Sequence, residues 1–205
     1  MASKKLDLWK YLELESASQR VKRYFDNQEK FTGRAFETFA GGGDAPDVKD
    51  VITSDDVVAV SLLSVNIPGS ASLAILEQKR DTLSEMLSGI PVELDLWDAD
   101  MDLIKNGGRA DKLWQELEKI GGVAWVTAGK LCARKRPRLI PVYDRIVKAA
   151  LSPGRKSFWT DLHFTLSSDP EIIERLAEIR QNSSIDSSPS LLRVLDVAIW
   201  MESQD

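Results

Sequence analysis

The sequence predicts an all-α protein of about ten helices. Apolar residues recur at the three- and four-residue spacing of amphipathic helices along nearly the whole chain, and caps or glycine and proline stops separate the segments. Apolar residues make up 43% of the 205 positions, which suffices for a core without disulfides or metals. We therefore expect a single globular unit spanning 1–205, built from two interlocked helical lobes with a cleft between them.

The first half of the chain contains four or five predicted helices. Apolar spacing over 8–25 predicts one or two amphipathic helices, and 31–39 a short helix stopped by three glycines at 41–43. Thr53 and Asp56 stand at capping-box spacing before the apolar run 57–65. This run is β-branched enough for a buried strand, but the cap and the lack of a partner strand favour a helix. A further helix is predicted over 73–87.

The second half alternates helices with short breaks. Residues 94–102 form a loop or a short helix, and Asp169 before Pro170 predicts a capped helix start. The last helix is apolar on most sides, so we expect it deep in the core, next to the N-terminal helices. The predicted helices of this half span 109–120, 125–135, 144–151, 156–166, 172–180 and 191–201, the last starting at Ser188-Pro189 after a polar linker.

Cysteine and histidine usage excludes several kinds of site. With one cysteine, Cys132, the chain cannot form an internal disulfide, a cysteine-ligated zinc site or an iron–sulfur cluster. A single histidine, His163, is expected to be packed or hydrogen-bonded, and Cys132 to be a core or half-buried thiol. We predict no metal and no cofactor. The sequence shows no signal peptide and no stretch of about 18 apolar residues, so we expect no membrane contact and a cytoplasmic location.

The basic residues are unevenly distributed. The segment from Lys130 to Lys156 contains nine basic residues and one acidic residue, a net charge of +8. The rest of the chain has 18 basic and 31 acidic residues, a net charge of −13. This asymmetry favours a nucleic-acid partner, with a solvated basic helix face as the alternative. The nine basic residues are Lys130, Arg134, Lys135, Arg136, Arg138, Arg145, Lys148, Arg155 and Lys156.

The window 120–144 carries the most specific pattern. It predicts a helix, a tight glycine hairpin at Gly121-Gly122, a second helix and then Asp144 as the N-cap of a third helix. Backbone N–H groups of such a hairpin, beside a helix N-terminus, suit a phosphate. Lys130 and Arg134 are four residues apart and so share one helix face.

This window resembles the core motif of the helix-hairpin-helix base-excision DNA glycosylases, most closely the adenine-glycosylase branch. That branch has a Leu-Pro-Gly-Val-Gly hairpin, then Thr-Ala-Gly, and an aspartate 17 residues after the threonine. Here Thr127-Ala128-Gly129 precedes Asp144 by the same spacing, and Pro141 lies three residues before the aspartate. The whole chain also resembles an uncharacterised, mostly actinobacterial family with Phe-Thr-Gly-Arg near its start and Arg-Pro-x-x-x-Pro-Val-Tyr-Asp in its middle.

Three residues differ from the glycosylase motif and change the activity that the resemblance implies. Gly121 replaces the hairpin's proline and Ala124 its last glycine, where a positive φ would be strained. The lyase-type members carry a lysine immediately before the threonine, whereas this chain has Val126. The resemblance therefore implies a monofunctional enzyme, with Lys130, one turn further on, as a displaced amine nucleophile in the alternative.

The resemblance implies a DNA N-glycosylase, a hydrolase of N-glycosyl bonds in base excision repair, acting on a base flipped from double-stranded DNA. Asp144 would stabilise the positive charge that develops on the deoxyribose and orient the attacking water. The alternatives are a non-catalytic nucleic-acid-binding module on the same scaffold, and a protein-interaction domain. The predicted DNA contacts are Gly121, Gly122, Val123, Ala124, Trp125, Val126, Thr127, Arg134, Arg136, Arg138 and Arg145.

Overall fold

The computed structural model describes residues 3–26, 31–153, 158–185 and 189–204. Within these ranges the fold is all-α, with eleven α-helices and no strand, as the sequence predicted. The predicted helix starts at Lys156 and Ser188, and the basic residues Arg155 and Lys156, lie outside the described residues.

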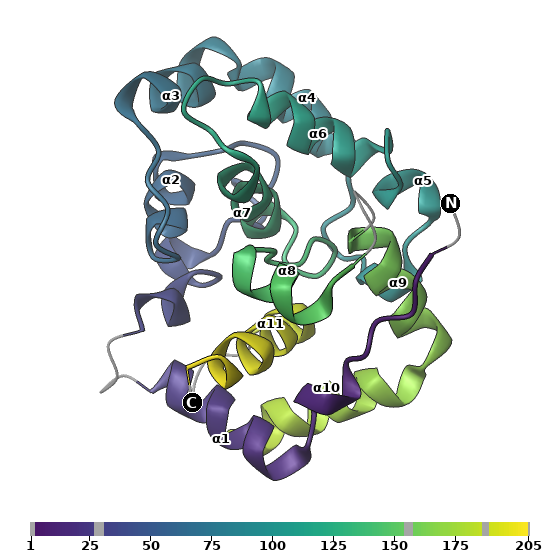
Figure 1. Ribbon diagram of the computed structural model, residues 1–205. Helices are drawn as coiled ribbons and strands as arrows, with labels where there is room; N and C mark the ends of the chain where they lie inside the picture. Colours follow the sequence, from purple (N-terminus) through teal and green to yellow (C-terminus); the bar gives the residue numbers. More distant parts are fainter. Residues whose placement is uncertain (1–2, 27–30, 154–157, 186–188, 205) are drawn as a thin grey trace.

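The middle of the chain forms one group of helices around α7 (Figure 1). Helix α7 is the centre of this group, because nine of its eleven residues are buried and it packs against both α2 and α6. The helices of this central group are α2 (Ser54–Ser61), α3 (Gly69–Leu73), α4 (Arg80–Ser88), α5 (Met101–Ile104), α6 (Arg109–Glu118) and α7 (Trp125–Lys135). Helix α5 also contacts α9 of the second group.

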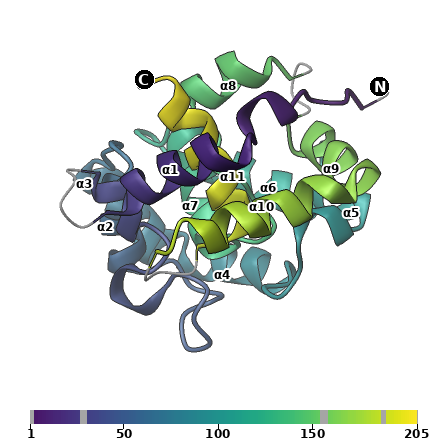
Figure 2. The same ribbon diagram turned by 90° about the horizontal axis from the view of Figure 1, so that it is seen from below.

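The two ends of the chain form the second group. Helices α1, α10 and α11 contact one another and lie side by side in both views (Figures 1 and 2), so the C-terminal helices return to the N-terminal one as predicted. Nine residues of α11 are buried, which confirms its expected place in the core. The helices of this terminal group are α1 (Leu14–Phe25), α8 (Arg145–Leu151), α9 (Phe158–Ser168), α10 (Pro170–Asn182) and α11 (Leu191–Glu202).

All three predicted helix starts are present, and two of them have the predicted side-chain cap. Thr53 and Asp56 form a reciprocal capping box at α2, which settles this run as a helix rather than a strand. Asp144 caps α8 through its side chain. Asp169 makes no side-chain cap at α10, because its carboxylate binds Lys5 and the Trp9 indole instead.

The predicted helix over 31–39 is wrong. The chain there makes two short 3-10 segments, η2 (Thr32–Ala35) and η3 (Phe39–Gly41). The carbonyl groups of Phe36, Glu37 and Phe39 accept hydrogen bonds from the Arg134 guanidinium, and the Phe39 carbonyl also accepts from the Gly42 N–H in a 3-10 turn. A tertiary contact therefore decides the local conformation, and sequence periodicity does not.

The predicted helix over 73–87 is interrupted. After α3 the chain makes a π turn, η4 (Ala74–Gln78), and Lys79 leaves the helical region with φ −110° and ψ 7° before α4 begins. The Lys79 ammonium group then pairs with Glu116 of α6 at 2.5 Å.

Two further 3-10 segments complete the described helical structure, η1 (Trp9–Tyr11) and η5 (Leu96–Asp98). The second lies within the predicted 94–102 element.

Candidate active site

Two of the predicted DNA contacts are buried structural cations. Arg134 and Arg136 are 1% and 0% exposed, so the prediction that they bind phosphate is wrong. The guanidinium of Arg134 binds Asp56 and three backbone carbonyls. The guanidinium of Arg136 binds Asp50 and the carbonyls of Lys49, Leu87, Ile90 and Lys135.

A similar correction applies to Lys135 and Arg138 of the basic segment. Lys135 is fully buried, and its ammonium group binds Asp56 and the carbonyls of Val48 and Val51. Arg138 is partly exposed, but Asp95 and Glu93 neutralise its guanidinium at 2.6 Å. Much of the charge asymmetry of the sequence therefore comes from cations that hold loops together inside the protein, whereas Arg145 and Lys148 of the same segment are exposed.

A tight glycine turn joins α6 and α7 at the position of the predicted hairpin. The Val123 N–H donates to the Ile120 carbonyl at 2.9 Å, and Gly122 takes the positive φ of +92° that the turn requires. Ala124 has φ −81° and ψ 167°, so the strain expected at this position is absent. Val123 is buried and its N–H is occupied, which removes it from the predicted nucleic-acid contacts.

The hairpin presents an open helix N-terminus. Ala124, the N-cap of α7, offers no side-chain cap to the first turn of the helix. Gly121, Gly122 and Ala124 are exposed, and Trp125 is half-buried with its carbonyl accepting from the Trp114 indole at 3.0 Å. The first N–H groups of α7 therefore have no side-chain acceptor from their N-cap residue, an arrangement that suits an anion.

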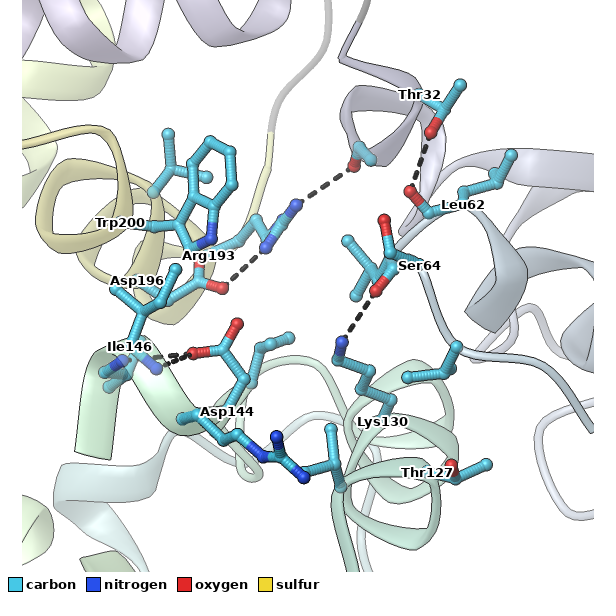
Figure 3. A pocket seen from close by; sticks show the side chains of 18 of the residues that line it. Thr32, Leu62, Ser64, Thr127, Lys130, Asp144, Ile146, Arg193, Asp196 and Trp200 are labelled. Atoms are coloured by element: carbon cyan, nitrogen blue, oxygen red, sulfur yellow. Dashed lines mark hydrogen bonds and ion pairs between the residues drawn. The ribbon is translucent and has the colours of Figure 1, made fainter. Parts of the chain in front are cut away.

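A cavity of about 680 Å³ lies between the central and terminal groups (Figure 3). Its wall includes 124–127 and Lys130 of the hairpin and α7, Val142 and 144–147 at the start of α8, and 62–66 after α2. From the terminal group it includes Tyr24, Arg193, Asp196, Val197 and Trp200, and residues 31–33 also line it. The structure thus brings Asp144 and Lys130 together in one cavity, together with Trp125, Val126, Thr127 and Arg145.

Asp144 is fixed at the rim of this cavity. Its Oδ1 accepts hydrogen bonds from the N–H groups of Ile146 and Val147, at 2.9 and 3.0 Å. Its Oδ2 makes no hydrogen bond with the described residues and is left toward the cavity (Figure 3). The positive end of α8 stabilises the negative charge of a carboxylate held in this way.

Lys130 lies across the cavity from Asp144 (Figure 3). The side chain is 5% exposed, and its ammonium group donates to the Leu63 carbonyl at 2.7 Å. Burial lowers the pKa of Lys130, while the charge of Asp144 opposes the shift. The cavity therefore contains a fixed carboxylate and an amine that is easier to deprotonate than an ordinary lysine.

The sequence analysis missed two charged residues of the cavity wall. Arg193 and Asp196 lie one turn apart on α11, 4% and 5% exposed, and are bonded at 2.5 Å. Burial raises the pKa of Asp196 to about 7, with Arg193 opposing and with Glu37 and Asp144 adding to the shift. The signal was present, because two opposite charges at i and i+3 in an otherwise apolar helix must be buried as a pair.

The Phe-Thr-Gly-Arg motif also reaches the cavity. The Gly33 carbonyl accepts from Arg193 at 3.0 Å, and Arg193 also donates to the Tyr24 hydroxyl at 2.5 Å. A Cβ on Gly33 would lie 2.1 Å from that hydroxyl, so only glycine fits. The rings of Tyr24 and Phe31 stack with centroids 5.3 Å apart, and Trp200 meets both edge-on. This motif and Asp144 therefore come from distant parts of the sequence to opposite walls of one cavity.

Cys132 and His163 have the surroundings that were predicted for them. Cys132 is buried, and burial raises the pKa of its thiol, which confirms a core thiol. His163 is hydrogen-bonded to the Ala99 carbonyl at 3.1 Å, as predicted. Among the described residues, no three His, Cys, Asp or Glu side chains are grouped to hold a metal ion. None of the described helices combines the length and apolar character needed to cross a bilayer.

The comparisons place the chain in a family without supplying a function. No curated protein and no solved structure matches the chain. A family of unknown function (DUF6308) matches residues 17–203, from the first helix to the last. The match includes both walls of the cavity, with Tyr24 and Trp200 near its two ends. The chain therefore belongs to the family of unknown function DUF6308.

Proposed function

We propose that the protein is a monofunctional DNA N-glycosylase that removes a damaged or modified base. The observation that carries the proposal is Asp144, a carboxylate anchored through one oxygen at a helix N-terminus and facing a cavity large enough for a base. The order of elements supports it, because α6, the glycine turn and α7 precede this carboxylate in the register of the helix-hairpin-helix glycosylases. In this proposal, the central and terminal groups of helices correspond to the two predicted lobes.

The proposed reaction uses the geometry as follows. A nucleotide is flipped from the duplex into the cavity, where the half-buried rings of Phe31 and Trp200 offer an aromatic surface for stacking. As the bond from C1′ to the base stretches, positive charge grows on the sugar, and the Asp144 carboxylate stabilises it. Asp144 also orients the water that attacks C1′. The Gly121–Val126 hairpin, with the open N-terminus of α7, holds a DNA phosphate.

Monofunctional chemistry is favoured over a lyase. The position immediately before Thr127 is Val126, which has no amine. Lys130 is the nearest amine in the cavity, but its ammonium group is bound to the Leu63 carbonyl. In this proposal Lys130 supplies positive charge beside Asp144, and water is the nucleophile.

The Asp144→Asn variant is expected to lose base release by about a hundredfold or more, the scale of removing one preorganised electrostatic group. Asparagine caps a helix as well as aspartate, so α8 is retained. The assay incubates the protein with duplexes that each contain one uracil, hypoxanthine, 8-oxoguanine, 7-methylguanine or mismatched adenine. Abasic sites are scored by alkaline cleavage.

Asp100→Asn is the matched control, because Asp100 caps α5 through its side chain and does not line the cavity. This variant is expected to release base at the wild-type rate. Undiminished release by Asp144→Asn would contradict the proposal. If the wild-type protein released no base but bound duplex DNA, the non-catalytic nucleic-acid-binding alternative would replace it.

DNA binding is expected to depend only moderately on salt. Arg134 and Arg136 are buried, so the exposed cations near the hairpin are Arg145 and Lys148. The Lys148 Nζ lies 5.4 Å from the centroid of the Trp125 ring. Two phosphate contacts predict a slope of log K against log salt of roughly −2. In a fluorescence-anisotropy titration, the DNA affinity of the Arg145→Ala/Lys148→Ala variant is expected to change little with salt concentration.

Lys22→Ala is the control for this titration, because Lys22 is an exposed cation of α1 that does not line the cavity. It should leave the slope unchanged. A protein without salt-dependent DNA affinity would favour the protein-interaction alternative. An equal loss of slope in Lys22→Ala would argue against a defined site at the hairpin.

A further inference from the structure

Lys130 is a largely buried cation on the wall of the cavity. Its side chain is 5% exposed, and its ammonium group donates a hydrogen bond to the Leu63 carbonyl at 2.7 Å. Figure 3 shows this ammonium group pointing into the space between Asp144 and the 62–64 segment. A molecule that occupies the cavity therefore lies against the positive charge of Lys130.

The position of this ammonium group is fixed by the segment that it contacts. The Thr32 hydroxyl donates to the Leu62 carbonyl at 2.8 Å, next to the carbonyl that Lys130 binds (Figure 3). Ser64, on the other side of that carbonyl, has a φ of +61°, in the left-handed region that few residues other than glycine adopt. Surrounding contacts must maintain such a conformation. Lys130 is therefore a preorganised group and not a freely rotating surface amine.

Most of the hydrogen-bonding capacity of Lys130 is unused. An ammonium group has three N–H donors and no acceptor. Within the described part of the chain, the Leu63 carbonyl takes one of these donors and no second acceptor is bonded to the group. Because buried polar groups are nearly always paired, the remaining donors are suited to an acceptor on a bound molecule.

The charges of the cavity suit a single acceptor atom. Burial lowers the pKa of Lys130, whereas the negative charge of Asp144 opposes this effect and favours the ammonium form. Arg193, the other buried cation of the wall, is already bonded to Asp196 and to two further acceptors. One buried cation with unused donors suits a carbonyl oxygen better than a phosphate group, which several donors usually bind.

We propose that Lys130 selects the base, by binding a carbonyl oxygen on the ring of the flipped nucleotide. This inference rests on the proposed glycosylase function and deepens it by naming the substrate class. An oxo group accepts from the ammonium group, whereas an exocyclic amino group would place a second donor against a buried cation. The substrates are neutral oxo bases, such as hypoxanthine and uracil. Adenine presents an amino group and a cationic alkylated base presents a like charge, so both are rejected.

The same contact favours the departure of an oxo base. As the bond from C1′ to the base breaks, its electron pair goes to the base, and negative charge spreads onto the oxo oxygen. The fixed charge of Lys130 stabilises this developing charge, while Asp144 stabilises the positive charge on the sugar. Water adds its oxygen to C1′ and gives a proton to Asp144, which releases it to solvent. Solvent protonates the departed base, so the net reaction is a hydrolysis.

The test uses two duplexes that contain hypoxanthine or adenine opposite cytosine, because these bases differ in the group at C6. Adenine is mismatched with cytosine and flips more easily, so a preference for hypoxanthine cannot come from base pairing. The wild-type protein is expected to release hypoxanthine with a kcat/KM about 10²-fold higher or more.

Two variants at Lys130 separate base selection from a role in folding. Lys130→Gln is expected to bring the ratio of the two kcat/KM values to within about tenfold, because an amide offers both a donor and an acceptor. Lys130→Arg keeps the charge and the donors, so it should retain the preference for hypoxanthine. If Lys130 only stabilised the fold, Lys130→Gln would lower both rates and leave their ratio unchanged.

Lys112→Gln is the matched control, because Lys112 is an exposed cation of α6 that does not line the cavity. It should leave both rates and their ratio unchanged. Should Lys130→Gln fail to fold, the wild-type protein is tested on a third duplex, which contains unsubstituted purine. Purine has no group at C6, so its release should be slower than that of hypoxanthine, and equal release would contradict the inference.

The outcomes distinguish this inference from the proposed function. Faster release of adenine than of hypoxanthine, or an unchanged ratio in Lys130→Gln, would overturn the inference and leave the glycosylase function in place. Release of no base from any duplex would remove the proposed function, and binding of the free bases would then decide the inference. Calorimetric titration of the wild-type protein should show tighter binding of hypoxanthine than of adenine. Equal affinities, or no binding of either base, would overturn it.

Discussion

The Asp56→Asn variant is expected to lower the free energy of unfolding by about 3–5 kcal/mol, the cost of removing one partner from a buried ion pair. Asp56 is 1% exposed and its two oxygens bind Arg134 at 3.0 Å and Lys135 at 3.1 Å. Asparagine leaves both cations buried without a counter-charge. The substitution also weakens the capping box of α2, because Asp56 accepts from the Thr53 N–H.

Thermal and urea unfolding measure this effect. For a chain of this size the loss corresponds to a decrease in Tm of roughly 6–20 °C. Asp55→Asn is the matched control, because Asp55 is the exposed neighbour in the first turn of α2. It should cost no more than about 1 kcal/mol through the helix dipole. Similar losses in the two variants would show that the buried cluster does not stabilise the fold as described.

The Gly43→Ala variant is expected to destabilise the protein by about 3 kcal/mol or more, at the upper end of the range for overpacking. A Cβ at this position would lie 2.6 Å from the Arg134 carbonyl and 2.8 Å from both the Arg134 Nε and the Asp56 Oδ1. The carbonyl belongs to α7, which is packed on several sides and cannot shift cheaply. The clash also separates the two charges of the buried pair.

Gly121→Ala is the control for this variant, because a Cβ there meets nothing within 4 Å and the φ is not positive. Its free energy of unfolding should lie within about 0.5 kcal/mol of wild type. The combined Gly43→Ala/Asp56→Asn variant should lose less than the sum of its single losses, because both act on one cluster. Strict additivity would place the two residues in independent parts of the core.

Local signals in the sequence determined much of the fold. Apolar periodicity, the Thr53–Asp56 capping box and the glycine turn at Gly122 each act within a few residues, and each appears where it was predicted. The apolar composition of 191–201 likewise requires burial wherever the chain goes, and α11 is buried. Asp144 as a helix cap is of the same kind, because a cap depends only on the two or three residues that follow it.

Predictions that depended on distant partners were the ones that failed. A lysine or arginine on a helix has the same local pattern whether it faces water, DNA or a buried carbonyl. The 31–39 segment failed for the same reason, because its carbonyls are taken by Arg134, about a hundred residues further along the chain. Arg193 and Asp196 were passed over because the apolar residues around them dominated the pattern of that helix.

The sequence by itself determined that the chain is helical, where most helices begin and end, and that Asp144 stands at a helix start after a glycine hairpin. Only the tertiary structure decided that the cations of α7 are internal, and that Asp144, Lys130 and Asp196 share one cavity. The physical reason is that caps and turns are satisfied by neighbouring backbone groups. A buried charge or an open cavity depends on segments that only folding brings together.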